Sequence, residues 1–351
     1  MTVRYRALAL WLALWLCPLW GSAETFLVTS DLHLSKQGEA PALEALKTAP
    51  GEALILLGDS TDNAHPGEHA RMLDFLQTLE RPAWVIPGNH DLAGSFDAED
   101  FAGLYADFGR DAAFSRDESS AGCAVMTPGG TCLLLLDTNA LDGYGNAYPS
   151  GGVGEATVAW VRRALSALPE DTPVVACGHH PLLPDRLSPS LAGALLEGGV
   201  KLYLCGHDHG FAAVKQGGLQ QITVGQPQAY PGWAGLLEID GSGYHWQVHT
   251  LYRQDDPVFL EMSARARLLG LNMARGVLKG TACEGDEAAV GWFAEAFERV
   301  LTSRLDEESC AALLADPEAE KWRGIETATV VKGWIFSLLE HCPQDVRDIR
   351  G

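Results

Sequence analysis

Basic residues are scarce in this 351-residue chain, which has 25 lysines and arginines against 46 aspartates and glutamates, a formal net charge of −21. A protein that reads a nucleic-acid groove needs a basic surface, so we expect no nucleic-acid partner. The chain also lacks internal repeats and low-complexity segments, which excludes collagen-like and repeat architectures. Its hydrophobic content of 47% excludes a disordered chain. What remains is a folded protein of one large domain or two smaller ones.

Long hydrophobic runs are also rare. The run 7–20 is uncharged, follows Arg4 and Arg6, and precedes small residues at 21–23, which is the pattern of a secretory signal peptide over 1–23. At 14 residues it is shorter than the roughly 20 that a membrane helix needs. We therefore expect a secreted or periplasmic protein with no stable membrane span after leader cleavage. A retained N-terminal membrane anchor is the minor alternative.

No Cys-x-x-Cys pair is present, which argues against a thiolate zinc site. An exported chain meets an oxidising compartment, where disulfides persist. Cys123 and Cys132 flank a Pro-Gly-Gly turn between two apolar runs, so they are the best candidates for a cross-strand disulfide. Cys283, Cys310 and Cys342 are candidates for one more pair.

Between residue 24 and about residue 253, short apolar runs alternate with longer amphipathic segments. This alternation predicts an α/β domain whose strands are buried on both faces. The expected strands are 26–29, 53–57, 83–86, 132–136, 174–177 and 201–205, and the expected helices are 41–48, 68–79, 99–108, 154–168 and 189–197. Residues 211–252 carry shorter alternating runs separated by glycine turns, which predict β-hairpins.

After Pro257 we expect no further strands. Apolar stripes at helical spacing predict amphipathic helices over 260–278, 287–301 and 325–339. The sequence is therefore divided into a signal peptide (1–23), an α/β domain (24–253) and a helical C-terminal domain (254–351). The sequence names no partner for the helical domain.

Metal-ligating side chains follow five of the expected strands. The five segments are Asp31-Leu32-His33, Gly58-Asp59-Ser60-Thr61-Asp62, Gly88-Asn89-His90-Asp91, Gly178-His179-His180 and Gly206-His207-Asp208-His209. Six of the eleven histidines lie in these loops, and functional sites of α/β sheets assemble at the carboxyl edge of the strands. Asp31 and His33 are two residues apart, as are His207 and His209, so on extended backbone each pair would face the same way.

The order Asp-x-His, Gly-Asp-x-x-Asp, Gly-Asn-His-Asp, Gly-His and Gly-His-x-His resembles the calcineurin-like metallophosphoesterase superfamily. The resemblance implies a four-layer α/β/β/α sandwich with two divalent ions at the sheet edge. It also implies that His90 is the catalytic histidine and that Asp91 orients it. The implied ligands are Asp31, His33, Asp59 and His209 for one ion, and Asp59, Asn89, His179 and His207 for the other, with Asp59 as the bridge.

The chemistry of two closely spaced divalent ions agrees with this assignment. Such a pair needs a shared carboxylate and mixed nitrogen and oxygen ligands. It lowers the pKa of a bridging water and neutralises phosphoryl oxygens, while His90 protonates the leaving alkoxide or stabilises its developing charge. This ligand set accepts Mn, Fe, Zn or Co.

Departures from related subfamilies narrow the expected activity. Asp62 stands where purple acid phosphatases place a tyrosine ligand, and Asn63-Ala64 stand where protein phosphatases carry Arg-Gly. The remaining resemblance is to a bacterial secreted or cyclic-nucleotide-phosphodiesterase-like branch. Without a basic cluster, we expect a small phosphomonoester or phosphodiester substrate, contacted by the loops 143–154 and 226–233.

Two alternatives to this function stay open at the level of the sequence. One is a catalytically silent, metal-stabilised binding protein. The other is a phospholipid or cell-envelope phosphodiesterase.

Overall fold

The structure is a computed structural model. It describes residues 23–34, 39–93, 96–141, 146–184, 187–301, 307–326, 330–340 and 344–351, without the side chains of Val330 and Trp334. Residues 1–22 of the expected signal peptide and Cys342 lie outside the described residues. In the part of the chain that is described, no helix combines the length and apolar character needed to cross a membrane.

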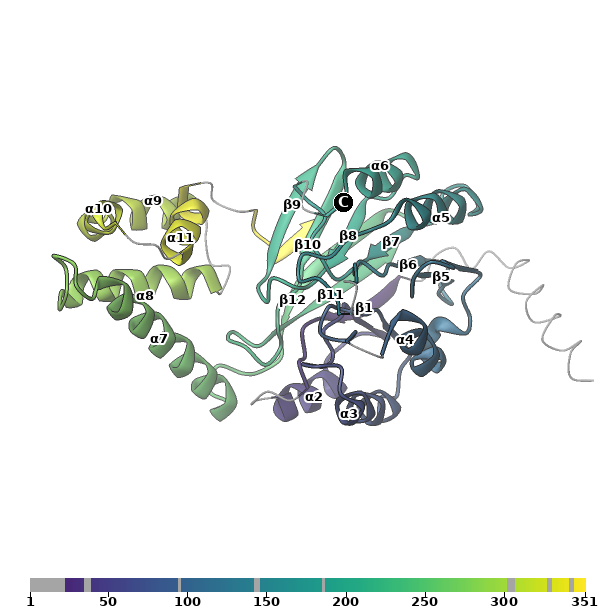
Figure 1. Ribbon diagram of the computed structural model, residues 1–351, viewed down its shortest axis with the longest axis horizontal. Helices are drawn as coiled ribbons and strands as arrows, with labels where there is room; N and C mark the ends of the chain where they lie inside the picture. The colour runs from purple at the N-terminus through teal and green to yellow at the C-terminus, as the bar shows by residue number, and fades with distance from the viewer. Residues whose placement is uncertain are drawn as a thin grey trace, which may run out of the picture.

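Two sheets form the main lobe of the molecule (Figure 1). The first sheet has the order β13-β12-β11-β1-β2-β3. Its strands are β1 (Glu24–Thr29), β2 (Ala53–Leu56), β3 (Ala83–Val85), β11 (Trp233–Asp240), β12 (Gly243–Thr250) and β13 (Asp348–Arg350). The second sheet has the order β4-β5-β6-β7-β8-β10-β9. Its strands are β4 (Ser115–Arg116), β5 (Cys123–Met126), β6 (Cys132–Leu135), β7 (Val174–Cys177), β8 (Leu202–Cys205), β9 (Ala212–Gln216) and β10 (Leu219–Thr223).

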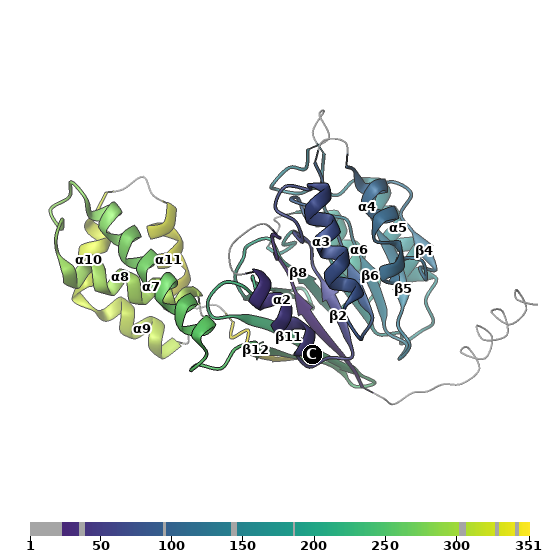
Figure 2. The same cartoon turned by 90° about the horizontal axis from the view of Figure 1, so that it is seen from below.

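Helices cover the outer face of each sheet, as the two views in Figures 1 and 2 show. The first sheet is covered by α2 (Glu39–Thr48), α3 (Pro66–Gln77), α4 (Ala98–Leu104) and the π-helical turn η1 (Ala106–Arg110), and the second by α5 (Glu155–Ser166) and α6 (Pro189–Glu197). Successive residues of β1 illustrate the layering, because Val28 packs between the two sheets while Leu27 packs against the helices. The expected four-layer α/β/β/α sandwich and its two hairpins, β9–β10 and β11–β12, are confirmed.

Each sheet contains a run of parallel strands, whose carboxyl ends lie at one edge of that sheet. In the first sheet β1, β2 and β3 are parallel, and in the second β6, β7, β8 and β10 are parallel. Parallel strands present all their carboxyl ends at the same side of a sheet. The loops that follow β1, β2, β3, β7 and β8 carry the five motifs, so the topology brings these motifs together.

A second lobe consists of α7 (Pro257–Leu278), α8 (Glu287–Leu301), α9 (Glu307–Ala315), α10 (Pro317–Gly324) and α11 (Val330–Glu340) around its own aromatic core. The expectation of one helix over 325–339 is wrong at its start, because Ile325 caps α10 and α11 begins at Val330. Tyr230 of the main lobe contacts Phe259 at the start of α7, with ring centroids 5.5 Å apart.

The expectation that no strand follows Pro257 is wrong, and the C-terminal domain does not keep all of residues 254–351. β13 returns to the first sheet and pairs antiparallel with β12, with Trp246 opposite Ile349. Ile349 and Val346 join the core between the two sheets, and the Trp246 ring donates a hydrogen bond to the Val346 carbonyl at 2.9 Å. A three-residue strand with a single apolar side chain leaves no periodic signal in the sequence.

The proposed disulfide between Cys123 and Cys132 is also wrong. The β5–β6 hairpin pairs Met126 with Cys132 and Cys123 with Leu135, so the two cysteines are not opposite each other. They also point to opposite faces of the sheet, since Cys123 packs between the sheets and Cys132 packs against the outer helices. Both are buried free thiols, and Cys283 is free as well.

Candidate metal centre

Five of the seven expected metal ligands lie on left-handed backbone. The φ angles are 57° at Asp31, 44° at His33, 50° at Asp59, 72° at His207 and 57° at His209. Positive φ costs a non-glycine residue roughly 1–3 kcal/mol and is concentrated at functional sites. We expected the side chains of each pair, Asp31 with His33 and His207 with His209, to face the same way because the backbone is extended. The backbone is left-handed at these residues, so that reason is wrong. The side chains converge because each loop turns sharply at the end of its strand.

The glycines beside the ligands allow these loops to approach one another. A Cβ atom on Gly88 would clash with the backbone and carboxylate of Asp59, and a Cβ atom on Gly206 would clash with Ser30 and the carboxylate of Asp31. A side chain at either position would therefore separate loops that must touch. Gly88 joins the second and third motifs, and Gly206 joins the first and fifth.

The first group of ligands is assembled from three loops. One ligand atom from each of Asp31, His33, Asp59 and His209 lies within 4.8 Å of the others. The Nε2 atoms of His33 and His209 are 3.2 Å apart, and His209 Nε2 is 3.5 Å from the Asp31 carboxylate. His33 Nε2 is 3.7 Å from Asp59 Oδ2. Both carboxylates are buried, whereas the side chain of His209 is 43% exposed, so this group opens to solvent on one side.

The second group lies on the other side of Asp59. His179 Nε2 is 3.3 Å from Asp59 Oδ2, the same oxygen that faces His33. The Asn89 side-chain oxygen is 3.1 Å from His207 Nδ1. The His207 backbone N–H donates to both oxygens of Asp31, at 3.3 and 3.1 Å, which ties the two groups together. Asp59 thus stands between both groups, as expected of a bridging ligand.

The electrostatics of the buried carboxylates indicate that a cation belongs between them. Burial raises the pKa of Asp31 to about 7, with His179 opposing the rise and Asp59 adding to it. Burial would also raise the pKa of Asp59, but the facing His179 ring and the hydrogen bond from the His90 N–H outweigh it and lower that pKa. Among the described residues, no lysine or arginine forms an ion pair with either carboxylate.

The donor set suits two divalent ions. The His179 Nδ1–H donates to the Leu57 carbonyl at 2.8 Å, which leaves Nε2 aimed at Asp59 without a hydrogen-bond partner. An orphaned imidazole nitrogen beside two carboxylates is what a metal site requires, and imidazole, carboxylate and amide oxygen together suit Mn, Fe, Zn or Co. The residues present therefore fit the group that the sequence predicts.

Asp62 has a role that the sequence prediction missed. Its Oδ1 is 3.1 Å from His33 Nδ1, so the carboxylate fixes the ring and leaves His33 Nε2 for an ion. Its backbone carbonyl accepts a hydrogen bond of 2.6 Å from His90 Nδ1. One residue thus orients both a ligand and the expected catalytic histidine. The sequence carried one indication of this role, because Asp62 stands where purple acid phosphatases place a tyrosine ligand.

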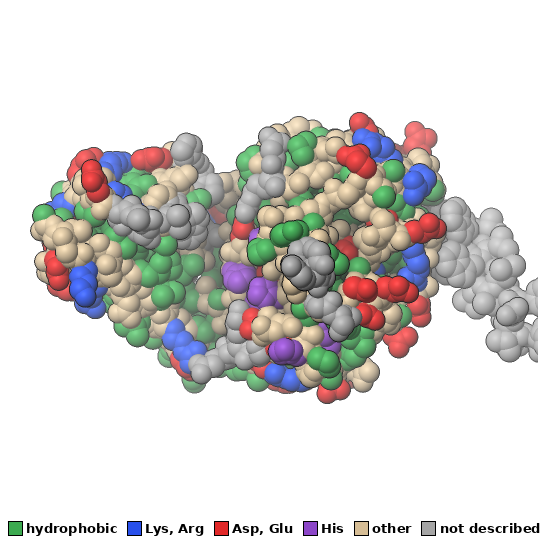
Figure 3. Space-filling view, viewed as in Figure 1, with side chains coloured by type: hydrophobic (Ala, Val, Ile, Leu, Met, Phe, Trp, Pro, Cys, Tyr) green, Lys and Arg blue, Asp and Glu red, His purple; other side chains and the backbone are tan. Residues whose placement is uncertain are grey.

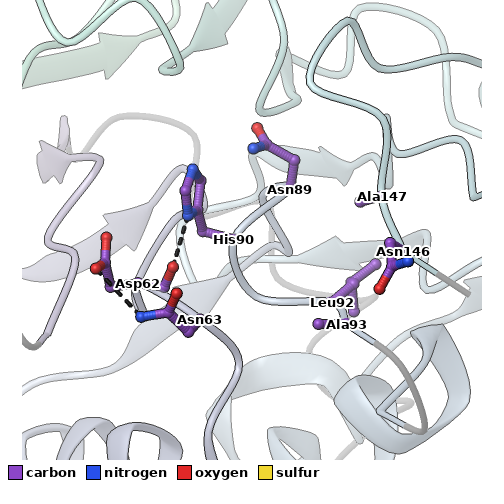
Figure 4. A pocket seen from close by; sticks show the side chains of 8 residues that line it. All are labelled: Asp62, Asn63, Asn89, His90, Leu92, Ala93, Asn146 and Ala147. Atoms are coloured by element: carbon purple, nitrogen blue, oxygen red, sulfur yellow. Dashed lines mark hydrogen bonds between the residues drawn. The ribbon is translucent and has the colours of Figure 1, made fainter.

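His90 lies at the wall of a cavity of about 210 Å³ beside the ligands. Figure 4 shows His90 and Asn89 on one side of it and the loop of Asn146 and Ala147 on the other. The lining residues are Asp62, Asn63, Asn89, His90, Leu92, Ala93, Asn146 and Ala147, and no lysine or arginine occurs among them. Figure 3 shows histidine side chains at the surface of the main lobe, beside the hollow that separates it from the helical lobe.

Asp91 does not orient the His90 ring as expected. Its buried carboxylate accepts hydrogen bonds from the backbone N–H groups of Gly88, Ser60 and Thr61 and from the Thr61 hydroxyl. Burial and the nearby Asp59 raise its pKa to about 6. Asp91 therefore holds the second and third motif loops against each other, and the ring is oriented by Asp62.

Two further contacts involve residues outside the five motifs. Thr138, which follows β6, contacts the ring and backbone of His180. Gln228 in the loop 226–233 donates from its side-chain amide to the carbonyls of Asp31 and Leu32, at 2.9 Å each. The expected rim loop 226–233 therefore supports the first motif. Residues 143–145 of the other expected rim lie outside the described residues.

The chain is similar in sequence to several curated proteins. The chain is 29% identical over 144 residues to the rat tartrate-resistant acid phosphatase type 5, which covers 36% of this chain and 43% of that protein. It is 28% identical over 154 residues to the glycerophosphodiester phosphodiesterase GpdQ of Enterobacter lignolyticus, which covers 44% of this chain and 50% of that protein. The chain thus spans about half the length of these curated relatives.

Solved structures that resemble this chain include TT1561 of Thermus thermophilus, with a TM-score of 0.46 and 17% identity over 66% of this chain and 100% of that chain. Another is the purple acid phosphatase PPD1 of yellow lupin, with a TM-score of 0.46 and 12% identity over 66% of this chain and 52% of that chain. The family model for calcineurin-like phosphoesterases matches residues 24–211, more than half of the chain. The chain therefore belongs to the calcineurin-like phosphoesterase family.

Proposed function

We propose that this protein hydrolyses a small phosphate ester with two divalent ions. The carrying observation is the convergence of Asp31, His33, Asp59 and His209 on one side of Asp59, and of Asn89, His179 and His207 on the other, next to the cavity that His90 lines. Two divalent metal ions held in this way supply a water nucleophile near neutral pH and neutralise phosphoryl oxygens.

His90 is the proposed proton donor to the leaving group. Because Nδ1 donates to the Asp62 carbonyl, the proton that the ring exchanges is on Nε2. Figure 4 shows this second nitrogen on the side of the ring opposite Asp62. His33 packs edge-on against His90, with centroids 4.8 Å apart, so the ring is held between a ligand and a backbone acceptor. His90 is thus placed to protonate an alkoxide.

The cavity favours a phosphodiester over a phosphomonoester. Its wall combines the apolar Leu92, Ala93 and Ala147 with the amides of Asn63 and Asn146. Such a wall suits the uncharged second alcohol group of a diester. No described residue of the wall is a lysine or arginine that could pair with a further negative charge on the substrate. The relatives include both a phosphatase and a glycerophosphodiester phosphodiesterase, and they support the reaction class rather than the choice between the two ester types.

Hydrolysis of bis-p-nitrophenyl phosphate and p-nitrophenyl phosphate by protein reconstituted with Mn²⁺ or Zn²⁺ tests the proposal. We expect turnover of both esters with a preference for the diester. Asp59→Asn and Asn89→Ala should each lose at least about 100-fold, because the first replaces the bridging carboxylate by a neutral amide and the second removes a ligand. Asp74→Asn, which alters an exposed aspartate on α3, is the matched control. No turnover with either ion, or unchanged turnover in both ligand variants, would refute the proposal.

The same experiment separates this function from a catalytically silent, metal-stabilised binding protein. A silent protein would gain thermal stability on adding either ion and still show no turnover. A phospholipid or cell-envelope phosphodiesterase would show turnover with the small diester and more with a lipid diester in vesicles.

We also propose that the protein is exported. The charged start, the apolar run 7–20 and the small residues at 21–23 support this. Expression with a C-terminal tag, followed by N-terminal sequencing of the extracellular or periplasmic fraction, should give a chain that starts at Glu24. A full-length chain in the membrane fraction would instead identify a retained anchor.

A further inference from the structure

His180 is not one of the seven ligands, yet its ring lies against them. The residue is 2% exposed, and its Nε2 atom is buried without a hydrogen-bond partner among the described residues. Ring nitrogens of His179, His180 and His207 lie within 4.8 Å of one another. Leaving a buried polar atom unsatisfied costs about 1–3 kcal/mol, so an unpaired Nε2 calls for an explanation.

The hydrogen bonds of Thr138 determine which nitrogen of His180 carries the proton. The Thr138 hydroxyl oxygen accepts from the backbone N–H of His179 at 3.2 Å and from that of His180 at 3.1 Å. A hydroxyl has two lone pairs and one proton. With both lone pairs used, the proton is donated to His180 Nδ1, which lies 2.9 Å away. The neutral His180 ring must then carry its own proton on Nε2.

The neighbouring histidine has the opposite arrangement. His179 donates from Nδ1 to the Leu57 carbonyl, so its Nε2 offers a lone pair to an ion. His180 accepts at Nδ1, so its Nε2 offers an N–H group. An N–H group cannot ligate a cation, but it can donate to an oxygen anion. Two adjacent histidines therefore face one site with complementary chemistry.

The position of His180 is fixed from several directions. The Tyr203 hydroxyl donates to the His180 carbonyl at 2.8 Å. Gly151, with φ of 65°, packs so closely on the ring that a Cβ atom there would lie 2.6 Å from it. The Gly152 N–H donates to the Thr138 carbonyl at 2.9 Å, which holds this loop against the ring. A donor held this rigidly is preorganised for its acceptor.

We propose that His180 is a phosphate-contacting residue, which donates its Nε2–H to a phosphoryl oxygen of the substrate and of the phosphate product. The inference rests on the proposed function for the identity of the acceptor. The position of the proton on His180 is independent of the proposed function, because it follows from the hydrogen bonds of Thr138.

The position of the proton is tested first, on the metal-free protein. Long-range ¹H–¹⁵N correlation spectra of the ¹⁵N-labelled wild-type chain should show a protonated Nε2 and an unprotonated Nδ1 for His180, assigned by its absence in His180→Gln. In Thr138→Val, which removes the hydroxyl, the proton should redistribute between the two nitrogens, whereas Thr138→Ser should keep the wild-type pattern. An unprotonated Nε2 in the wild type would overturn the inference.

The acceptor is tested by binding inorganic phosphate to the Mn²⁺-loaded protein, with calorimetry for affinity and elemental analysis for the ions per chain. His180→Ala should keep the wild-type ion content and bind phosphate about 10- to 100-fold more weakly, the loss expected for one hydrogen bond to a charged group. His180→Gln, whose amide also carries N–H, should recover part of the affinity. His249→Gln on β12 controls for the loss of a histidine elsewhere.

Either of two results of the binding experiment would also overturn the inference. Loss of an ion in His180→Ala would make the residue a ligand, and unchanged phosphate affinity would make it purely structural. A wild-type protein that hydrolyses no ester would refute the proposed function alone, because the spectra and the phosphate titration would still decide the role of His180.

Discussion

Replacing Asp31 by asparagine should stabilise the metal-free protein at alkaline pH, even though it removes the charge of a candidate ligand. In the folded chain the pKa of Asp31 is raised from 3.8 to about 7 by burial. Between these values the folded state keeps a proton that the unfolded state has released. Rising pH therefore favours unfolding, and the destabilisation is complete above pH 7. The full shift corresponds to about 4 kcal/mol, of which more than half develops between pH 5 and pH 8.

Asparagine cannot ionise, yet its side-chain oxygen still accepts a hydrogen bond from the His207 N–H. The Asp31→Asn variant should therefore gain about 2–3 kcal/mol relative to wild type as the pH rises from 5 to 8. Urea unfolding in the presence of a chelator measures this gain. Comparing the two pH values cancels any constant effect of the substitution on packing.

Adding Mn²⁺ at pH 8 should reverse the order of stability, because the ion binds the folded wild type and compensates its buried carboxylates. Asp74→Asn should show no pH-dependent difference from wild type. If the gap between Asp31→Asn and wild type stays constant from pH 5 to pH 8, the reasoning about buried charge is refuted.

Three further predictions follow from contacts described above. Asp62→Ala should weaken metal-ion binding about 10- to 100-fold by calorimetry, because His33 loses the carboxylate that orients it. Asp62→Asn should lose less affinity. Equal affinities in the wild type and both variants would contradict this role. Ile349→Ala should lower the free energy of unfolding by about 2–4 kcal/mol in urea, since Ile349 is buried between the sheets, whereas exposed Arg350→Ala should have little effect. Thiol titration of the protein unfolded without reductant should find Cys123, Cys132, Cys177 and Cys205 all reactive, and a Cys123–Cys132 peptide in a non-reduced digest would show that the pairing of β5 with β6 is wrong.

The strands and the positions of the candidate ligands were predictable from the sequence for one reason. Each central strand is buried on both faces, so it stands out as a continuous apolar run, and each ends in glycine or a short polar segment. Asp59, Asn89 and His179 directly follow such runs. The same signal exists after β6, where Asp137, Thr138 and Asn139 follow an apolar run, and Thr138 was missed there because hydroxyl and amide side chains do not by themselves suggest a metal site.

Other features could not be read from the sequence because they depend on distant pairing. The disulfide prediction used the turn between Cys123 and Cys132, but the hairpin register decides which face each side chain occupies. The role assigned to Asp91 followed its position beside His90, whereas its contacts run to backbone groups of the second motif. β13 is a strand because it pairs with β12, where Trp246 lies opposite Ile349. A three-residue segment has too few apolar side chains to predict that pairing.

The return of β13 to the sheet also has a consequence for how the protein folds. β12 ends at Thr250, and the strand that pairs with it begins at Asp348, beyond the five described helices of the second lobe. During synthesis, β12 is therefore an unpaired sheet edge until residues 346–350 have left the ribosome, while the loops that carry the five motifs are already made. The helical lobe is an insertion between two neighbouring strands, tethered at both ends. Deleting it as a unit and joining β12 to β13 by a short turn should leave the sandwich intact, whereas truncating the chain before β13 should expose the edge to aggregation.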